Sequence, residues 1–315
     1  TGLHERGDNI DDLTNLPKAL RQRISEELPL GLTPEEESVS DDGETVKWLW
    51  RLHDGHHIET VLMHYEDRTT VCVSSQAGCA MACSFCATGQ SGFERHLSVG
   101  EIVEQVVRAR RTSAPRRVSN IVFMGMGEPF ANYDRMWAAV ERINQDLGIG
   151  ARHITISTVG VVPGIDRLAE ENLPVNLAVS LHFATDEDRN ELVPLNARYP
   201  LAMLEESCAR YLDAKNRRLS FEWALIDGVN DRASDADELA ILARRLRAHV
   251  NLIPLNPTPG YLTRGTPIDR VYEFRDRLTG MGVNATVRRT RGTEIDAACG
   301  QLRASRQLVD PPRRR

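Results

Sequence analysis

The chain has 315 residues, of which 41% are hydrophobic and 27% are charged. That length suits about two average domains or one large α/β barrel with an appendage, and the composition excludes collagen-like, disordered and disulfide-scaffold proteins. No apolar run reaches the roughly 18 residues that a membrane-spanning helix needs, and no secretory signal opens the chain. We therefore expect a cytoplasmic protein that has no membrane partner.

Acidic side chains are concentrated near the N-terminus. Residues 1–70 contain 16 of the 45 acidic side chains but only 7 of the 39 basic ones, which leaves residues 71–315 with a slight excess of positive charge. Arginines cluster at 108–117, 288–291 and 313–315. These clusters could bind the phosphates of a nucleic acid or could be solvated helix faces, and the charge pattern alone leaves both readings open.

Hydrophobic periodicity predicts the secondary structure in chain order. Residues 11–27 indicate a helix, and residues 45–50 and 59–63 indicate two strands of a hairpin that turns at residues 53–56. Six alternations of strand and helix follow. The strands are expected at 70–74, 120–124, 153–157, 175–181, 219–226 and 250–255, and the helices at 98–111, 133–146, 164–172, 201–215, 235–248 and 269–281. With a seventh strand expected at 285–289, this alternation predicts an α/β protein of six β/α units.

Four of the six cysteines fall within residues 72–86, in a chain without secretory features. Such a cluster indicates metal or redox chemistry rather than a disulfide framework. Cys79, Cys83 and Cys86 form a C-x3-C-x2-C loop, which can hold an iron–sulfur cluster and leave one iron open for a reactant. The alternative is a structural zinc site, but zinc usually takes four protein ligands, and Cys72 lies seven residues before the loop. Cys208, four residues from both Leu204 and Leu212, is expected to be a packing residue.

Glycine and polar residues follow several of the predicted strands. Because the carboxyl ends of the strands in a β/α barrel meet at one rim, these residues are expected to bind a ligand such as a nucleoside together. Each of them alone is equally well explained as a loop residue with satisfied hydrogen bonds. They are Gly127, Glu128, Ser157, Ser180, Leu181, His182 and Asn256.

The aromatic Phe85 before Cys86 makes the cysteine loop resemble the signature of radical S-adenosylmethionine (SAM) enzymes. Longer strings, at 72–79, 85–89, 124–129 and 291–302, together resemble the RlmN/Cfr family of radical SAM RNA (adenine) methyltransferases, and the likeness extends from about residue 9 to residue 302. The resemblance implies a partial (β/α)6 TIM-like barrel with an N-terminal β-hairpin extension. It also implies a [4Fe–4S] cluster on Cys79, Cys83 and Cys86, and two SAM molecules per turnover.

The same resemblance assigns catalytic roles to three further residues. Cys299 takes a methyl group from a first SAM, and a radical made from a second SAM activates that methyl group to attack adenine. Cys72 then releases the RNA by forming a disulfide with Cys299, and Glu59 takes up the proton from the attacked carbon. Without the resemblance, Cys299 would be read as a buried packing residue and Glu59 as a solvent-facing strand residue.

The resemblance also gives a domain organisation and partners. Residues 1–40 correspond to the end of a helical accessory region, 41–68 to the β extension, 69–302 to the radical SAM core and 303–315 to a basic tail. The implied activity is methylation of adenosine C2 in 23S rRNA, at the peptidyl transferase centre, and in tRNA, at adenosine 37, with a one-electron donor such as flavodoxin. The alternatives are C8 methylation as in the Cfr branch, a radical SAM enzyme for a small molecule or peptide, and a non-catalytic zinc-containing RNA-binding module.

Overall fold

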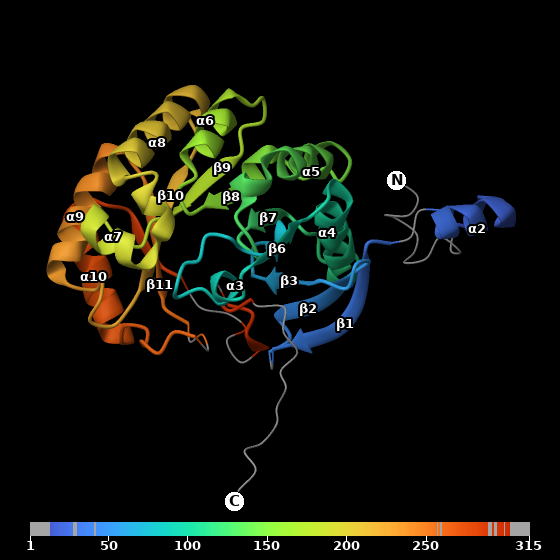
Figure 1. The fold of residues 1–315 in the computed structure, drawn as a ribbon, viewed down its shortest axis with the longest axis horizontal. Coiled ribbons are helices and arrows are strands. Elements are labelled where there is room, and N and C mark those ends of the chain that lie inside the picture. The colour runs from blue at the N-terminus through green and yellow to red at the C-terminus, as the bar shows by residue number, and fades with distance from the viewer. Residues whose placement is uncertain are drawn as a thin grey trace, which may run out of the picture.

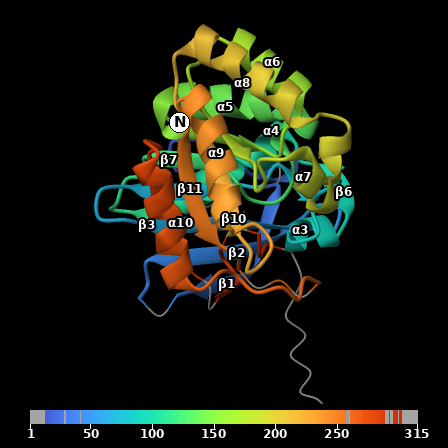
Figure 2. The same cartoon turned by 90° about the vertical axis from the view of Figure 1, so that its left-hand side faces the viewer.

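The computed structural model describes residues 13–27, 30–40, 42–256, 258, 260–288, 292, 295–298 and 300–302. Its main feature is a ten-stranded sheet in the order β1-β2-β3-β4-β7-β8-β9-β10-β11-β12, and β5 (Gln76–Gly78) and β6 (Phe93–His96) form a second, two-stranded sheet. The large sheet curves, and the long helices lie on the outer side of the curve (Figure 1). The side view in Figure 2 places β1 and β2 at the opposite end of the molecule from α6 and α8.

Seven neighbouring strands of the large sheet run parallel, as β/α units require. They are β4 (Thr69–Cys72), β7 (Asn120–Phe123), β8 (Ile154–Thr158), β9 (Asn176–Ser180), β10 (Leu219–Leu225), β11 (His249–Pro254) and β12 (Ala285–Val287). The six predicted strands and the seventh are confirmed. Within the described residues, β12 ends the sheet without pairing to β1, so the expected α/β fold is an incomplete barrel.

Six helices connect the parallel strands and cover the outside of the sheet. They are α4 (Val99–Ser113), α5 (Tyr133–Gln145), α6 (Val162–Glu170), α8 (Leu201–Lys215), α9 (Ala233–Arg245) and α10 (Ile268–Gly280), all close to the predicted ranges. In α4, for example, Ile102, Val106 and Ala109 are fully buried at helical spacing. A capping box between Ser98 and Glu101 fixes where this helix begins.

Shorter elements fill the connections, and most of them carry no periodic signal. They are α3 (Ala87–Gln90), α7 (Asp186–Leu192) and the 3₁₀ helices η2 (Pro129–Asn132), η3 (Ala151–His153) and η4 (Pro194–Ala197). The first helix within the described residues, α2 (Lys18–Glu27), begins later than the predicted range 11–27. Pro17 explains why the helix does not begin earlier. Proline disfavours a helical conformation in the residue before it, here Leu16, so the helix begins only after Pro17. Among the described residues we find no helix with the length and apolar character of a membrane span.

Three antiparallel strands extend the barrel sheet at its N-terminal edge: β1 (Leu32–Val39), β2 (Thr45–Leu52) and β3 (His57–His64), of which β3 pairs with β4. The predicted hairpin of β2 and β3 is confirmed, and Gly55 at its turn has a φ of +90°. Strand β1 was not predicted. It lies inside residues 1–40, which the resemblance assigns to the helical accessory region.

The reason β1 has no sequence signal is its position at the edge of the sheet. Most of its side chains are exposed, so hydrophobic and polar residues do not alternate along it. Polar contacts with β2 hold it instead: Trp48 Nε1 donates to Glu37 Oε2 at 2.6 Å, and Arg51 Nε lies 3.0 Å from Glu35 Oε1. These contacts depend on pairing that the local sequence does not reveal.

One buried side chain of α4 joins the β1–β3 extension to the barrel. Gln105 Oε1 accepts hydrogen bonds from Ser74 N and from Thr60 Oγ1, both at 2.8 Å, and its Nε2 donates to Ser74 O at 3.0 Å. Trp50 Nε1 in turn donates to Thr60 Oγ1 at 3.0 Å. Gln105 is fully inaccessible to solvent, so none of these groups can exchange its partner for water.

Replacing Gln105 by leucine is expected to lower the free energy of unfolding by about 2–4 kcal/mol, because several buried donors and acceptors would lose their partner. Denaturant unfolding of the two proteins under identical conditions measures the difference. Gln22→Leu on the exposed face of α2 is the matched control and should cost less than about 0.5 kcal/mol. Equal midpoints for Gln105→Leu and the unchanged protein would contradict the role of this network.

Candidate functional site

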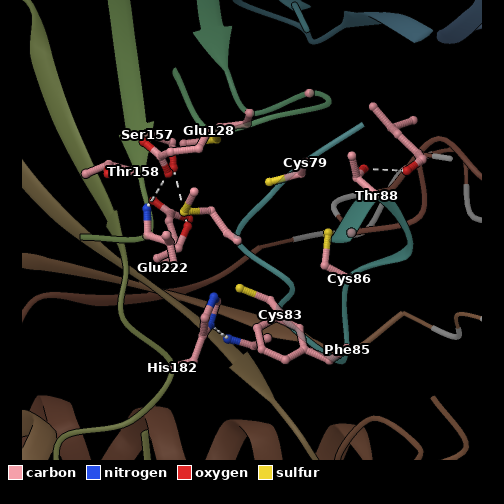
Figure 3. A pocket seen from close by; sticks show the side chains of 18 of the residues that line it. Cys79, Cys83, Phe85, Cys86, Thr88, Glu128, Ser157, Thr158, His182 and Glu222 are labelled. Atoms are coloured by element: carbon pink, nitrogen blue, oxygen red, sulfur yellow. Dashed lines mark hydrogen bonds between the residues drawn. The ribbon is translucent and has the colours of Figure 1, made fainter. Parts of the chain in front are cut away.

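A cavity opens at the carboxyl ends of the parallel strands, with an empty volume of about 1050 Å³ that includes space open to solvent. The cysteine loop covers one side of it, and the turns after β7, β8 and β9 form the other (Figure 3). This is the rim on which barrel enzymes place their chemistry. The sequence-predicted residues that line it are Cys79, Cys83, Cys86, Gly127, Glu128, Ser157, Ser180, His182 and Asn256.

Local backbone geometry shapes the cysteine loop. It leaves β5 at Gly78, where φ is +71° and a Cβ atom would lie 2.0 Å from the carbonyl oxygen of Gly92. After the last cysteine the chain enters α3, and a Cβ atom on Gly89 would lie 2.9 Å from the carbonyl oxygen of Cys83. The backbone therefore passes so close to Gly78 and to Gly89 that a larger side chain would not fit at either position. Figure 3 shows the sulfur atoms of all three cysteines on the cavity side.

The three thiols fit an iron–sulfur cluster chemically. Burial raises the pKa of the Cys79 thiol to about 12, and burial also raises the pKa of the Cys83 thiol. Such thiols become ligands only beside a group that brings strong positive charge, as bound iron does. Within the described residues, no three His, Cys, Asp or Glu side chains are arranged to hold a single metal ion. In a cluster each cysteine binds a different iron, so this donor set suits a cluster of several irons.

The turn after β7 brings a buried carboxylate to the cavity. Glu128 Oε1 accepts a hydrogen bond from Phe130 N at 3.1 Å, and its Oε2 accepts one from Val159 N at 2.9 Å. Burial raises the pKa of Glu128 to about 7. The turn packs closely against the start of β5, since a Cβ atom on Gly127, where φ is +95°, would lie 2.5 Å from Gln76 Cβ. Glycine is therefore required beside this carboxylate.

The end of β9 supplies a neutral histidine. His182 Nδ1 accepts a hydrogen bond from Ala224 N at 3.0 Å, so its proton is on Nε2, and burial lowers the pKa of His182 to about 3. Its ring meets that of Phe85 edge to face, with centroids 4.9 Å apart. The aromatic residue of the cysteine motif thus packs the loop against the barrel rim.

Residues around His182 fix the strand ends. Ser157 Oγ and Ser180 Oγ lie 3.4 Å apart at the cavity wall.

Leu181, in contrast, does not line the cavity: its side chain is fully buried, its N–H donates to Glu222 O, and its carbonyl accepts from Arg189. Arg189 is itself buried and also donates to Asn196 Oδ1 at 2.8 Å. Leu181 was predicted as a ligand-binding residue, but the structure gives it a packing position.

Cys72 and Glu59 lie apart from the cavity lining, on the inner face of the sheet. Cys72 pairs in register with Val61 of β3 and with Val122 of β7. Because residues two apart on a strand share a face, Glu59 lies on the same side as Val61 and Cys72. Both are buried. Strand β3 of the extension and strand β4 of the barrel therefore present these two side chains on the face that continues the interior of the barrel.

The segment before and after Cys299 is held at two places, although Cys299 itself lies outside the described residues. Ala87 N donates to Gly300 O at 2.8 Å, and Thr88 Oγ1 donates to Leu302 O at 2.5 Å, which joins the segment to α3, the short helix that directly follows the cysteine loop. Gly300 and Leu302 line the cavity. At the other end of the segment, Lys47 Nζ donates to Asp296 O at 3.4 Å.

Sequence reasoning missed two charged residues near the site. Lys47 forms an ion pair with Glu59, with Nζ 3.0 Å from Oε1. Glu222 lines the cavity and accepts from Asn251 Nδ2 at 2.8 Å. Its Oε2 lies 3.8 Å from Arg288 Nη1 and has no hydrogen-bond partner among the residues that the structure describes. Glu222 is the single charged residue of β10, and that isolation is a signal that could have identified it. Lys47 shares β2 with Arg51, so its strand gives no such signal.

The arginine cluster at 108–117 makes contacts within the protein. Arg108 pairs with Glu104 at 3.1 Å, Arg110 Nη1 donates to Leu147 O at 3.0 Å, and Arg117 Nη2 donates to Gly148 O at 3.3 Å. Of the predicted cluster at 288–291, Arg288 lies 3.8 Å from Glu222, and the other arginines of this cluster and those at 313–315 lie outside the described residues. Cys208 is fully buried in the core, as expected for a packing residue.

Comparison with known proteins agrees with this architecture. Residues 73–240 match the Radical SAM superfamily. The crystal structure of a radical SAM methyltransferase from Sphaerobacter thermophilus is 53% identical and superposes with a TM-score of 0.93, covering 95% of this chain and 89% of that one.

Two relatives are named probable dual-specificity RNA methyltransferase RlmN. The protein from Salinispora tropica is 53% identical over 308 residues, which are 94% of this chain and 82% of that protein. The protein from Thermobifida fusca is also 53% identical, over 305 residues that are 93% of this chain and 84% of that protein. With this identity over nearly the whole chain, the protein belongs to the RlmN-type RNA methyltransferases of the radical SAM superfamily.

Proposed function

We propose that the protein methylates C2 of adenosine in 23S rRNA and in tRNA. The observation that carries this proposal is the double attachment of the described residues on either side of Cys299: Gly300 and Leu302 hydrogen-bond to α3, which directly follows the cysteine loop, and Asp296 hydrogen-bonds to the β extension. The chain on either side of the proposed methyl carrier therefore contacts both the cavity side and the extension. The relatives' names support RNA as the substrate and two kinds of RNA as targets.

The chemistry of adenine explains why such a site is needed. C2 is an electron-poor carbon without a lone pair, so it cannot displace the methyl group of SAM directly. When bound to Cys79, Cys83 and Cys86, the cluster would supply the electron that cleaves SAM to a 5'-deoxyadenosyl radical, and a flavodoxin-type protein is the donor we propose. Gly127, Glu128, Ser157, Ser180, His182 and Asn256 are the residues that would hold SAM around the cavity.

Three residues then act on the RNA. Cys299 carries the methyl group, from which the 5'-deoxyadenosyl radical would take one hydrogen atom to form 5'-deoxyadenosine, and the remaining CH2 carbon joins C2 of adenine. Glu59 accepts the proton of the attacked C–H bond, whose electron pair stays on the ring, and the one surplus electron leaves to a one-electron acceptor, a role that the oxidised cluster would fill. The Cys72 thiolate attacks the sulfur of Cys299, and a disulfide forms as the carbon–sulfur bond breaks; the released carbon keeps the electron pair of that bond and takes up a proton to become the methyl group. Burial of Glu59 and Cys72 on one face of neighbouring strands supports this division of roles.

We expect the reconstituted protein, incubated anaerobically with SAM, a reductant and unmodified 23S rRNA, to produce 2-methyladenosine. Mass spectrometry of the digested RNA identifies the product. The Cys299→Ala variant should form no methyladenosine, because no residue would carry the methyl group. Detection of 8-methyladenosine would move the activity to C8, and methylation by Cys299→Ala would refute the proposed carrier.

We expect Cys72→Ala to accumulate RNA covalently bound to the protein, because the adduct would form but would not be released. A denaturing gel without reductant should show a slowly migrating band that disappears after nuclease treatment. Cys208→Ala is the matched control, since Cys208 is also buried but lies in α8 on the outer layer. A Cys72→Ala variant that turns over like the Cys208→Ala control would rule out a resolving role.

A further inference from the structure

A lysine of the β extension links the two parts of the site that act on RNA. Lys47 lies on β2, and its side chain is only 13% exposed. Its ammonium nitrogen is 3.0 Å from Glu59 Oε1 and 3.4 Å from the carbonyl oxygen of Asp296. The Glu59 side chain is 4% exposed. One buried cation therefore contacts both the proposed proton acceptor and the segment that carries Cys299.

The sheet register explains why this lysine lies where it does. Lys47 pairs with Val61, and Val61 pairs with Cys72, so the three residues form one row across β2, β3 and β4. Residues in such a row project from the same face. The neighbours of Lys47 along β2, Val46 and Trp48, project from the opposite face and are buried there. The pairing of the extension with the barrel thus directs the ammonium group to the inner face.

A lysine at this position costs free energy of folding that an apolar side chain would not cost. A largely buried ammonium group loses hydration, and a well-packed apolar side chain of similar size often stabilises a fold as well or better. Its position also lies outside residues 73–240, the part of the chain that matches the superfamily in general. The lysine therefore belongs to the extension that distinguishes this chain from a bare radical SAM core.

We propose that Lys47 is a positioning residue for the methyl transfer: it fixes the orientation of the Glu59 carboxylate and its distance from the segment that carries Cys299. This inference rests on the proposed function. A proton acceptor must come within about 3 Å of the proton that it removes. Binding of one carboxylate oxygen by an ammonium group restricts rotation of the carboxylate, and the hydrogen bond to Asp296 relates the carboxylate to the methyl carrier. Asp296 has a left-handed φ of +51°, and its carbonyl oxygen accepts the hydrogen bond from Lys47 Nζ in this conformation.

The test compares Lys47→Met with Lys47→Arg in single-turnover reactions with 23S rRNA. Lys47→Met should slow RNA methylation on the order of 10- to 100-fold, because the proton acceptor would be misplaced, and the covalent RNA adduct should accumulate. Formation of 5'-deoxyadenosine and of S-methylated Cys299 should continue at the rate of the unchanged protein, since neither step uses Glu59. Lys47→Arg should restore most of the methylation rate, because it keeps the cation.

Two controls separate positioning from stability. Lys215→Met removes a lysine whose ammonium also binds a backbone carbonyl, that of Glu171, but on the outer helices, and it should leave methylation unchanged. In a protein that already carries Glu59→Gln, Lys47→Met should cause no further loss of rate, because Lys47 acts through Glu59. Additive losses in the double variant would contradict the proposal, as would loss of 5'-deoxyadenosine formation in Lys47→Met.

Failure of the inference is distinguishable from failure of the proposed function. If the unchanged protein methylates RNA and Lys47→Met does so at the same rate, only the role of Lys47 is refuted. If the unchanged protein cleaves SAM but produces no methylated adenosine in either RNA, the proposed function fails and the role of Lys47 fails with it.

Discussion

The pairing of β3 with β4 is the constraint on which the site depends. This antiparallel register joins the extension to the parallel barrel as one sheet, and it places Lys47, Val61 and Cys72 in a single row with Glu59 beside it. A shift of one residue would turn all of these side chains to the other face, under α4. The buried hydrogen bonds of Gln105 with Thr60 and Ser74 oppose such a shift, because they join both strands to the same helix. The polar inner face is thus specified by a network on the opposite, buried side of the sheet.

The barrel rim contributes the cavity side of the site, and burial together with backbone hydrogen bonds holds its polar groups in place. Its polar groups are withdrawn from water and held by backbone hydrogen bonds, as for Glu128 and His182. Burial lowers the pKa of His182 to about 3, which keeps this side chain uncharged, and raises the pKa of Glu128 to about 7. Groups that are held in place in this way need little reorganisation when a polar ligand binds at the rim. The C-terminal segment connects this rim to the extension, so that one short stretch of chain contacts both.

Local patterns predicted the parts of this structure that local physics determines. The cysteine spacing identified the loop, and hydrophobic periodicity located the strands and helices of the barrel, because each parallel strand is apolar and each outer helix is amphipathic. Strand β1 escaped prediction because edge pairing and polar contacts of Glu35 and Glu37 stabilise it. The sequence does not show that Leu181 differs from its neighbours Ser180 and His182, which line the cavity, because only the fold shows that its side chain enters the core. The contacts of Lys47 with Glu59 and of Glu222 with Asn251 form only when segments that are distant in the sequence are brought together.

The proposed reaction requires Cys72 of β4 and Cys299 of the C-terminal segment to meet at one site. Peptide mapping without reduction, after a single anaerobic turnover and alkylation of free thiols, shows whether they do. We predict that mass spectrometry will find a peptide pair joined by a Cys72–Cys299 disulfide, in an amount equal to the methylated adenosine formed. Recovery of both cysteines as alkylated free thiols, from protein that has methylated its RNA, would contradict the account.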